Sequence, residues 1–136
     1  MHGITARKAA GARVRIIVCG SRDFDDLAAV QRELPVRPAL DGAPATIVHG
    51  AARGADTLAG KIARTHPELF VEEAHPAEWD KHGKRAGILR NLEIVKLGAD
   101  LCIAFWDGGS PGTGHMIGAC ARNGIPVRVV PWRPRA

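Results

Sequence analysis

Three short glycine-containing turns carry most of the residues that could do chemistry in this chain. They span residues 20–24 (GSRDF), 49–56 (HGAARGAD) and 108–114 (GGSPGTG), and each directly follows an apolar run and leads into a helical pattern. Glycine lets a ligand approach the backbone closely, and a helix N-terminus offers free N–H groups to an anion. Three such turns in a chain of 136 residues predict a site for a phosphorylated small molecule.

The first turn holds two side chains suited to a phosphate. The hydroxyl of Ser21 can donate to a phosphate oxygen, and the guanidinium of Arg22 can bind a phosphate or carboxylate through two parallel hydrogen bonds. Gly20 allows a tight exit from the preceding strand. We therefore assign Ser21 and Arg22 to ligand binding and give Asp23 a structural role.

In the second turn, Gly50 and Gly54 are candidate positions for close backbone approach, and Arg53 could contact an anion. Asp56 falls in the first turn of the following helix, where a carboxylate stabilises the helix dipole by ~0.3–1 kcal/mol. The sequence supports a role in holding ribose hydroxyls and a role as a helix cap about equally. His49 is expected to be a packed, hydrogen-bonded residue.

A dense polar segment lies between the second and third turns. Of its residues we assign Trp79, Arg90 and Asn91 to the ligand site. Gly83 and Gly87 would each cost roughly 1 kcal/mol against alanine inside a helix. Close approach of a ligand or of a partner helix would explain that cost.

The third turn belongs to a loop that is rich in glycine and contains one proline. It is neither a Walker A motif nor a GxGxxG fingerprint. The loop could form a nest of N–H groups at the start of the last helix, which suits a phosphate. The residues assigned to this nest are Gly108, Gly109, Ser110, Gly112 and Thr113.

Apolar runs alternate with helical patterns along the chain, which predicts an α/β fold. The expected strands are 14–19, 45–48, 69–74, 100–106 and 126–130, and the expected helices begin near 25, 55, 84 and 113. We predict a Rossmann-like three-layer sandwich with a five-stranded parallel sheet in the order 3-2-1-4-5, which gathers the three turns at one edge. The side chains expected to face inward from the last two helices are Ile88, Leu92, Val95, Met116, Ile117, Cys120 and Ala121.

Composition narrows the class of protein. The net charge of +5 comes from two ends that hold five basic residues and no acid, at 1–13 and 131–136, and residues 14–130 hold 14 basic and 14 acidic residues. We therefore expect one neutral domain at 14–130 between two basic tails, and a core that does not bind nucleic acid. The three cysteines lack metal or redox spacing, so we expect neither a metal nor a cofactor. The absence of a membrane-length apolar run and of a signal peptide predicts a cytoplasmic protein.

Four segments together, at 20–24, 49–56, 77–91 and 108–115, resemble the SLOG superfamily of Rossmann-like domains and its branch of small YspA-type proteins from bacteria and phages. The resemblance covers about residues 14–130. It implies a nucleotide-derived ligand at the carboxyl ends of the strands, and the superfamily often forms homodimers.

The best-known enzymes of that superfamily, the LOG phosphoribohydrolases, carry a PGGxGTxxE motif. In this chain Gly112 and Thr113 match the GT pair, but Met116 stands at the glutamate position and one extra residue separates GG from GT. The pair at 90–91 falls where LOG proteins have a basic pair. Methionine cannot do carboxylate chemistry, so the resemblance assigns no catalytic residue.

The function favoured by the sequence is the binding, for sensing or processing, of a nucleotide-derived or phosphoribosyl small molecule. One alternative is an N-glycosidic hydrolase, which would need an acid; Asp23, Asp56, Glu78 and Asp107 are the candidates. Another is a single-strand nucleic-acid binder similar to DprA, which shares an SGxARGxD-like turn. The neutral core disfavours this second alternative.

Overall fold

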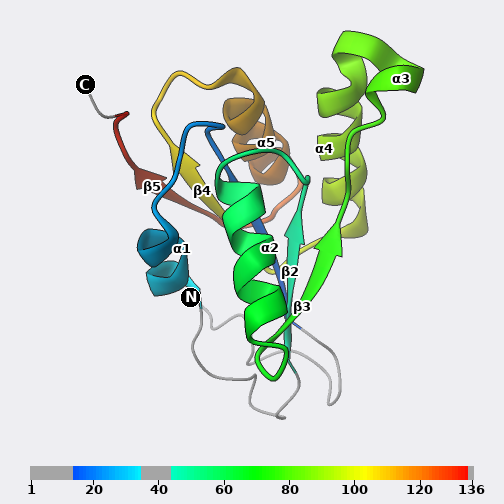
Figure 1. The fold of residues 1–136 in the computed structure, drawn as a ribbon. Coiled ribbons are helices and arrows are strands. Elements are labelled where there is room, and N and C mark those ends of the chain that lie inside the picture. Colours follow the sequence, from blue (N-terminus) through cyan, green and yellow to red (C-terminus); the bar gives the residue numbers. More distant parts are fainter. Residues whose placement is uncertain (1–13, 35–43, 135–136) are drawn as a thin grey trace.

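The computed structural model describes residues 14–34 and 44–134, which form a parallel five-stranded sheet between two layers of helices (Figure 1). The strands lie in the order β3-β2-β1-β4-β5, so the predicted fold class and strand order are confirmed. The strands are β1 (Arg15–Gly20), β2 (Ala45–His49), β3 (Phe70–Ala74), β4 (Leu101–Trp106) and β5 (Val127–Pro131). The helices are α1 (Leu27–Glu33), α2 (Ala55–Thr65), α3 (Trp79–His82), α4 (Ala86–Leu97) and α5 (Pro111–Arg122), and a 3₁₀ turn, η1 (Gly83–Arg85), precedes α4.

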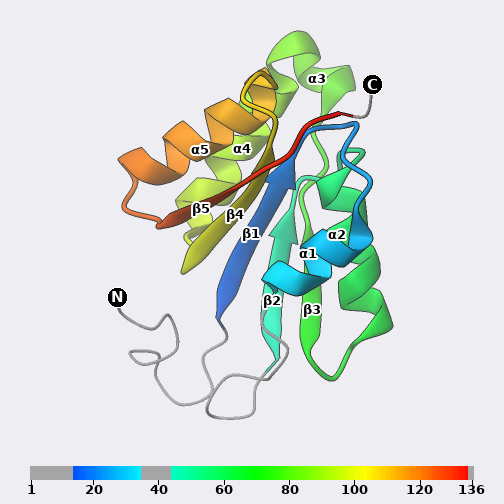
Figure 2. The same cartoon turned by 90° about the vertical axis from the view of Figure 1, so that its left-hand side faces the viewer.

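Each face of the sheet has its own apolar cluster, because successive side chains of a strand point to opposite faces. On β1, Ile16 and Val18 pack with α1 and α2, whereas Ile17 and Cys19 pack on the side of α4 and α5. Figure 2 shows the two helical layers on opposite sides of the sheet. The helices thus hold the strands from both sides and leave the carboxyl edge of the sheet to the loops.

The strand register brings the three glycine turns to this one edge. Gly20 at the end of β1 pairs with Phe105, one residue before the end of β4. On the other side of β1, Arg15 pairs with Thr46, and β2 ends at His49. The turns after β1, β2 and β4 therefore leave the sheet together, as the predicted topology requires.

The helix α4 differs from the expectation in the face that it buries. Ile94 and Val95 are buried, but Ile88 and Leu92 are nearly half exposed, so the prediction that these two face inward is wrong. The polar Asn91 is buried in their place. Relative to the expectation, α4 is rotated about its axis, so that Asn91 faces α5 and its Nδ2 contacts Gly112 and His115 there.

Two other segments depart from the expected boundaries. Trp79, expected in a loop, begins α3, and α5 begins two residues early, with Pro111 in the first turn where its missing N–H costs nothing. Within α5 the buried face includes Met116, Ala119 and Cys120. Ile117 is partly buried and packs against the core, as predicted, whereas Ala121 is exposed, contrary to the prediction.

The segment expected as a C-terminal tail includes a packed aromatic residue. The ring of Trp132 meets that of Phe24 edge-on, with centroids 5.3 Å apart and an interplanar angle of 78°. Phe24 in turn stacks on Phe105 of β4 at 4.7 Å. The folded unit therefore extends at least to Trp132; residues 1–13 of the predicted N-terminal tail lie outside the described residues.

Candidate ligand-binding site

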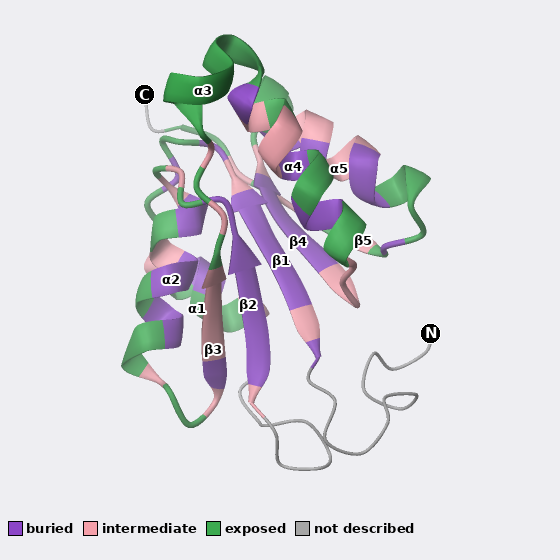
Figure 3. Cartoon of the chain, turned by 90° about the vertical axis from the view of Figure 1, so that its right-hand side faces the viewer, coloured by how far each residue is buried: buried purple, intermediate pink, exposed green. Residues whose placement is uncertain are grey.

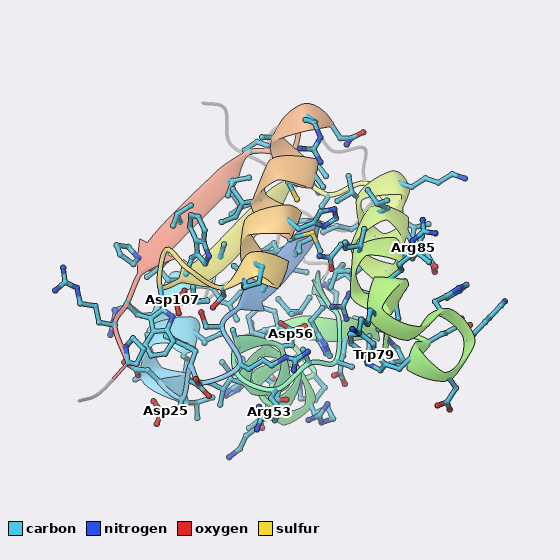
Figure 4. The ribbon with its side chains drawn as sticks, turned by 90° about the horizontal axis from the view of Figure 1, so that it is seen from above. Asp25, Arg53, Asp56, Trp79, Arg85 and Asp107 are labelled. Atoms are coloured by element: carbon cyan, nitrogen blue, oxygen red, sulfur yellow. The ribbon has the colours of Figure 1, made fainter. Side chains whose placement is uncertain are left out.

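A pocket of about 1120 Å³ lies at the carboxyl edge of the sheet, between the turn after β2, α3, α4 and the start of α5. Figure 4 looks down on this edge, with Asp56 near the middle of the view. The predicted site residues that line the pocket are Gly20, Ser21, Arg22, Gly50, Arg53, Asp56, Trp79, Arg90, Asn91, Ser110, Gly112 and Thr113. The other three, Gly54, Gly108 and Gly109, are not among its lining residues.

Asp56 holds the backbone of the second turn from inside. Its Oδ2 accepts hydrogen bonds from the N–H of Gly50 at 2.8 Å and from that of Ala52 at 3.3 Å. Burial raises the pKa of Asp56, and these two N–H groups and the positive charge of Arg90 act in the opposite direction. The carboxylate therefore holds the turn that precedes α2, and it does not cap the helix, whose N-cap residue is Gly54 and receives no side-chain hydrogen bond.

His49 holds the same turn from its other side. Its Nδ1 accepts from the N–H of Ala51 at 2.9 Å, which leaves the proton of the neutral ring on Nε2, 2.6 Å from Glu72 Oε2. Arg64 donates to both oxygens of Glu72 at 2.7 Å. Burial would raise the pKa of the Glu72 carboxyl, but the bonds from Arg64 and His49 lower it overall. His49 is thus buried and hydrogen-bonded, as expected.

Arg90 is tied to the protein backbone. Its Nη1 donates to the carbonyl oxygens of Gly50 and His75, the latter at 3.4 Å, and its Nε donates to Asn91 Oδ1 at 2.8 Å. A Cβ at position 50 would collide with the guanidinium, so a side chain there would displace Arg90 from its present position. Burial lowers the pKa of Arg90, and the charge of Arg22 acts in the same direction. Only Nη2 lacks a hydrogen-bond partner within the described part of the chain.

Asn91 joins α4 to the start of α5. Its Nδ2 lies 3.3 Å from the carbonyl oxygen of Gly112 and 3.3 Å from Nδ1 of His115. Burial lowers the pKa of His115, as does the charge of Arg122, which favours the neutral imidazole. His115 lines the pocket, although the sequence motifs assigned it no role beyond its place at the end of the segment 108–115. Its place early in α5, three residues after Gly112, was the available signal.

Three cations at the pocket are left for a ligand. Arg22, Arg53 and Lys84 line it, and none of them makes a hydrogen bond or salt bridge to another residue among those described. Lys84 belongs to the polar segment between the second and third turns, of which only Trp79, Arg90 and Asn91 were assigned to the site. Arg85, next to it and the last residue of η1, projects away from the centre of the view in Figure 4.

The loop after β4 uses its own carboxylate where an external anion was expected. Asp107 Oδ1 accepts from the N–H of Gly109 at 2.9 Å, the N–H of Ser110 at 2.8 Å and the Ser110 hydroxyl at 3.0 Å. These bonds lower the pKa of Asp107. The expected nest at 108–110 is therefore filled by the protein itself, and the first-turn N–H groups of Gly112 and Thr113 are the ones without an intrahelical acceptor.

The first turn is in contact with both of the others. Gly54 has a φ of +84°, and a Cβ there would collide with the carbonyl oxygen of Ser21, so this glycine lets the first two turns touch. The buried hydroxyl of Ser21 lies 2.7 Å from that of Ser110 and 3.4 Å from Nε1 of Trp132. Ser21 therefore connects the first turn to the third.

Comparison with known proteins agrees with these motifs. Residues 14–82, half of the chain, match the family described as YspA, cpYpsA-related SLOG family. This chain belongs to that SLOG family. The Gene 61 protein of Mycobacterium phage D29, a family relative, is 40% identical over 116 residues, which cover 83% of this chain and 93% of the relative. No solved structure matches the chain significantly.

Within this SLOG-family chain, few carboxylates are placed for acid–base chemistry. Met116, which the motif resemblance aligns with the glutamate of LOG enzymes, is buried and lines the pocket. Of the four acids considered from the sequence, Asp23 and Asp56 line the pocket, whereas Glu78 and Asp107 do not. Among the described residues no group of three or more His, Cys, Asp or Glu is arranged to hold a metal ion.

Proposed function

We propose that the pocket binds a nucleotide-derived or phosphoribosyl small molecule, which the protein senses or processes. The observation that carries this proposal is the trio of Arg22, Arg53 and Lys84, which line one cavity without an anionic partner among the described residues. A cavity of about 1120 Å³ is large enough for a nucleotide, since small-molecule sites commonly measure ~300–1,000 Å³. Membership of the SLOG family supports the same class of ligand.

The phosphate is best accommodated near Arg22. Arg22 and Arg90 line the same pocket, the positive charge of Arg22 contributes to the lowered pKa of Arg90, and Nη2 of Arg90 is uncommitted among the described residues. The N-terminus of α5, with the N–H groups of Gly112 and Thr113, lines the same pocket and favours negative charge. Two guanidiniums and a helix N-terminus form a suitable environment for one phosphate group.

The base is best accommodated by the apolar side of the pocket. Trp79 and Ile88 line it, and both side chains are about half exposed. A planar base can stack on an indole ring, which contributes ~1–3 kcal/mol per base in proteins that bind single strands. The pocket therefore offers a polar and an apolar region, as a nucleotide requires.

We also propose that two copies of the chain pair through α3 and α4. Trp79, Ile88 and Leu92 are 50%, 48% and 44% exposed, and we call these three residues the α4 surface. Figure 3 shows α3 and one side of α4 as largely exposed, in contrast to the strands. A second copy that covers these side chains would remove apolar area from water.

For location we propose the cytosol. Cys19, Cys102 and Cys120 are free and buried, and the sulfur atoms of Cys19 and Cys102 lie 3.9 Å apart without a bond. Reduced thiols so close together suit a reducing compartment. Among the described residues no helix has both the length and the apolar character needed to cross a membrane.

Mass spectrometry of small molecules that co-purify with the native protein identifies the ligand class, and calorimetry with nucleoside monophosphates then tests the site. We expect Arg22→Ala to weaken binding by about tenfold or more, since a hydrogen bond to a charged group is worth ~1.5–3 kcal/mol. Arg22→Lys keeps the charge but loses the two-pronged geometry, so it rescues binding only partly.

The matched control is Arg32→Ala, which removes the same charge from an exposed position on α1 outside the pocket. Deletion of residues 1–13 is a second control, and we expect both to keep the parent affinity. The proposal would be overturned if Arg22→Ala bound like the parent and the deletion lost binding. The basic N-terminal segment would then be the binding element, as expected for a protein that binds nucleic acid.

A further inference from the structure

One oxygen of Asp56 is not accounted for by the role of this residue in the turn. Both backbone hydrogen bonds go to Oδ2, and Oδ1 accepts none from the described residues. Asp56 is only 4% exposed, yet no fully buried polar side-chain atom among those residues lacks a partner. Oδ1 is therefore within reach of solvent, and since Asp56 lines the pocket, the pocket is the route.

The surroundings of Oδ1 decide what it can meet. A carboxylate repels a phosphate, so the phosphate does not occupy this part of the pocket. The two neighbouring groups that could donate to Oδ1 already donate elsewhere. Arg90 donates to Gly50 and Asn91, and His49 donates to Glu72. A ligand group that fits here must donate a hydrogen bond, and burial makes the bond strong because water competes little.

We propose that Oδ1 of Asp56 accepts a hydrogen bond from a sugar hydroxyl of the ligand, so that the pocket selects ribosyl over deoxyribosyl compounds. This inference rests on the proposed function and specifies its ligand. The sequence also allowed Asp56 to hold ribose hydroxyls. This inference assigns that role to Oδ1, the oxygen that does not bind the turn.

The division of the pocket favours a hydroxyl over an amino group of the base. The phosphate-binding groups, Arg22 and the start of α5, and the apolar residues Trp79 and Ile88 all contribute to the same lining as Asp56. In a nucleotide the sugar joins the phosphate to the base. A ligand that places its ends on these two regions leaves its sugar for the other polar groups of the lining, among which Asp56 is a buried carboxylate with an uncommitted oxygen.

The parent protein alone tests this inference by calorimetry with AMP, 2′-deoxy-AMP, 3′-deoxy-AMP and the 5′-monophosphate of purine riboside, which lacks the base amino group. We expect at least one deoxy compound to bind about tenfold or more weakly than AMP, since a hydrogen bond to a charged acceptor is lost. Equal dissociation constants for AMP and both deoxy compounds would overturn the inference and leave the proposed function standing. Binding weakened only by loss of the amino group would also overturn it, in favour of a contact to the base.

Failure of all four compounds and of ribose 5-phosphate to bind would overturn the proposed function, and this inference with it. Asp56→Asn then assigns the preference to this residue. The amide oxygen can keep the bonds to Gly50 and Ala52, while an NH₂ group replaces the pocket-facing acceptor. We expect the ratio of affinities for AMP and the weaker deoxy compound to fall toward one.

Asp25→Asn is the matched control, because Asp25 is exposed and lies outside the pocket lining. We expect this variant to keep the parent ratio of affinities. Circular dichroism of both variants shows whether the fold is retained. A preference that Asp56→Asn leaves unchanged in a folded protein would overturn the assignment to Asp56.

Discussion

At the scale of single residues, the charged groups of the pocket divide into those that hold the backbone and those without a partner among the described residues, to which we assign the proposed ligand. Arg90 and Arg22 look alike in the sequence, because both adjoin polar residues near a glycine. The structure separates them, since Arg90 donates to Gly50, which lies 40 residues away in the chain, and Arg22 has no such partner among the residues that the structure describes. A contact of that separation depends on the tertiary fold, so the sequence could nominate both residues but could not divide their roles.

Away from the pocket, one ion pair gives the stability a defined dependence on pH. Arg15 Nη1 and Nη2 donate to the two oxygens of Glu73 at 2.6 and 2.9 Å, and the hydrogen bond from Arg15 is the main reason that the pKa of Glu73 falls from 4.5 to about 2. Because the folded-state pKa is the lower one, this pair stabilises the fold above about pH 4.5, and the contribution is lost as the pH falls toward 2.

We therefore expect Glu73→Gln to lower the free energy of unfolding by about 1 kcal/mol at pH 7, a value discounted for solvent screening of a partly exposed pair. The difference from the parent should shrink between pH 4.5 and 2. Urea unfolding at several pH values measures it. Glu68→Gln, at an exposed position, controls for the loss of one carboxylate. A difference that stays constant down to pH 2 would contradict the prediction.

At the scale of elements, the sequence located the helices well and their orientation less well. The apolar positions 88, 92 and 95 follow helical spacing, which predicted that all three face inward. Of the three, only Val95 is buried. The actual inner face carries the polar Asn91, whose partners lie on α5. The periodicity of apolar side chains contains no information on buried polar groups. It therefore does not predict a helix whose inner face carries a buried asparagine.

The outward face of α4 makes the pairing of two copies testable. We expect Ile88→Glu to shift a parent dimer to the monomer, because a charge placed among the exposed apolar side chains of the α4 surface would lose its hydration in the interface. Light scattering at high micromolar concentration gives the mass of each species. Because Ile88 also lines the pocket, Leu92→Glu, outside the pocket lining, separates pairing from ligand binding.

The control for pairing is Val129→Glu, which alters an exposed apolar residue on the edge strand β5. We expect it to keep the mass of the parent. A parent that is monomeric at these concentrations would contradict the pairing proposal. Dissociation by Val129→Glu but not by Leu92→Glu would place the contact on β5.

At the scale of the whole molecule, the order of strands and the gathering of the turns followed from the sequence. Alternating strands and helices leave few ways to build a parallel sheet, and those ways place the loops after β1, β2 and β4 at one edge. The packing of Trp132 on Phe24 could not be predicted in this way. It joins the last described segment of the chain to its first turn, and no local pattern marks such a contact.

The arrangement of the whole pocket also predicts what the protein does not catalyse. We expect little or no phosphoribohydrolase activity on nucleoside monophosphates, because the position of the LOG glutamate is occupied by Met116, a buried side chain that can neither donate nor accept a proton. Asp56 does not substitute for it, since one of its oxygens holds the turn through Gly50 and Ala52. Chromatography of AMP incubated with the protein measures release of adenine, and calorimetry on the same sample shows whether AMP is bound. Adenine release at about one per second or faster, a rate typical of enzymes, would refute the prediction and make Asp23 and Asp56 the first residues to substitute.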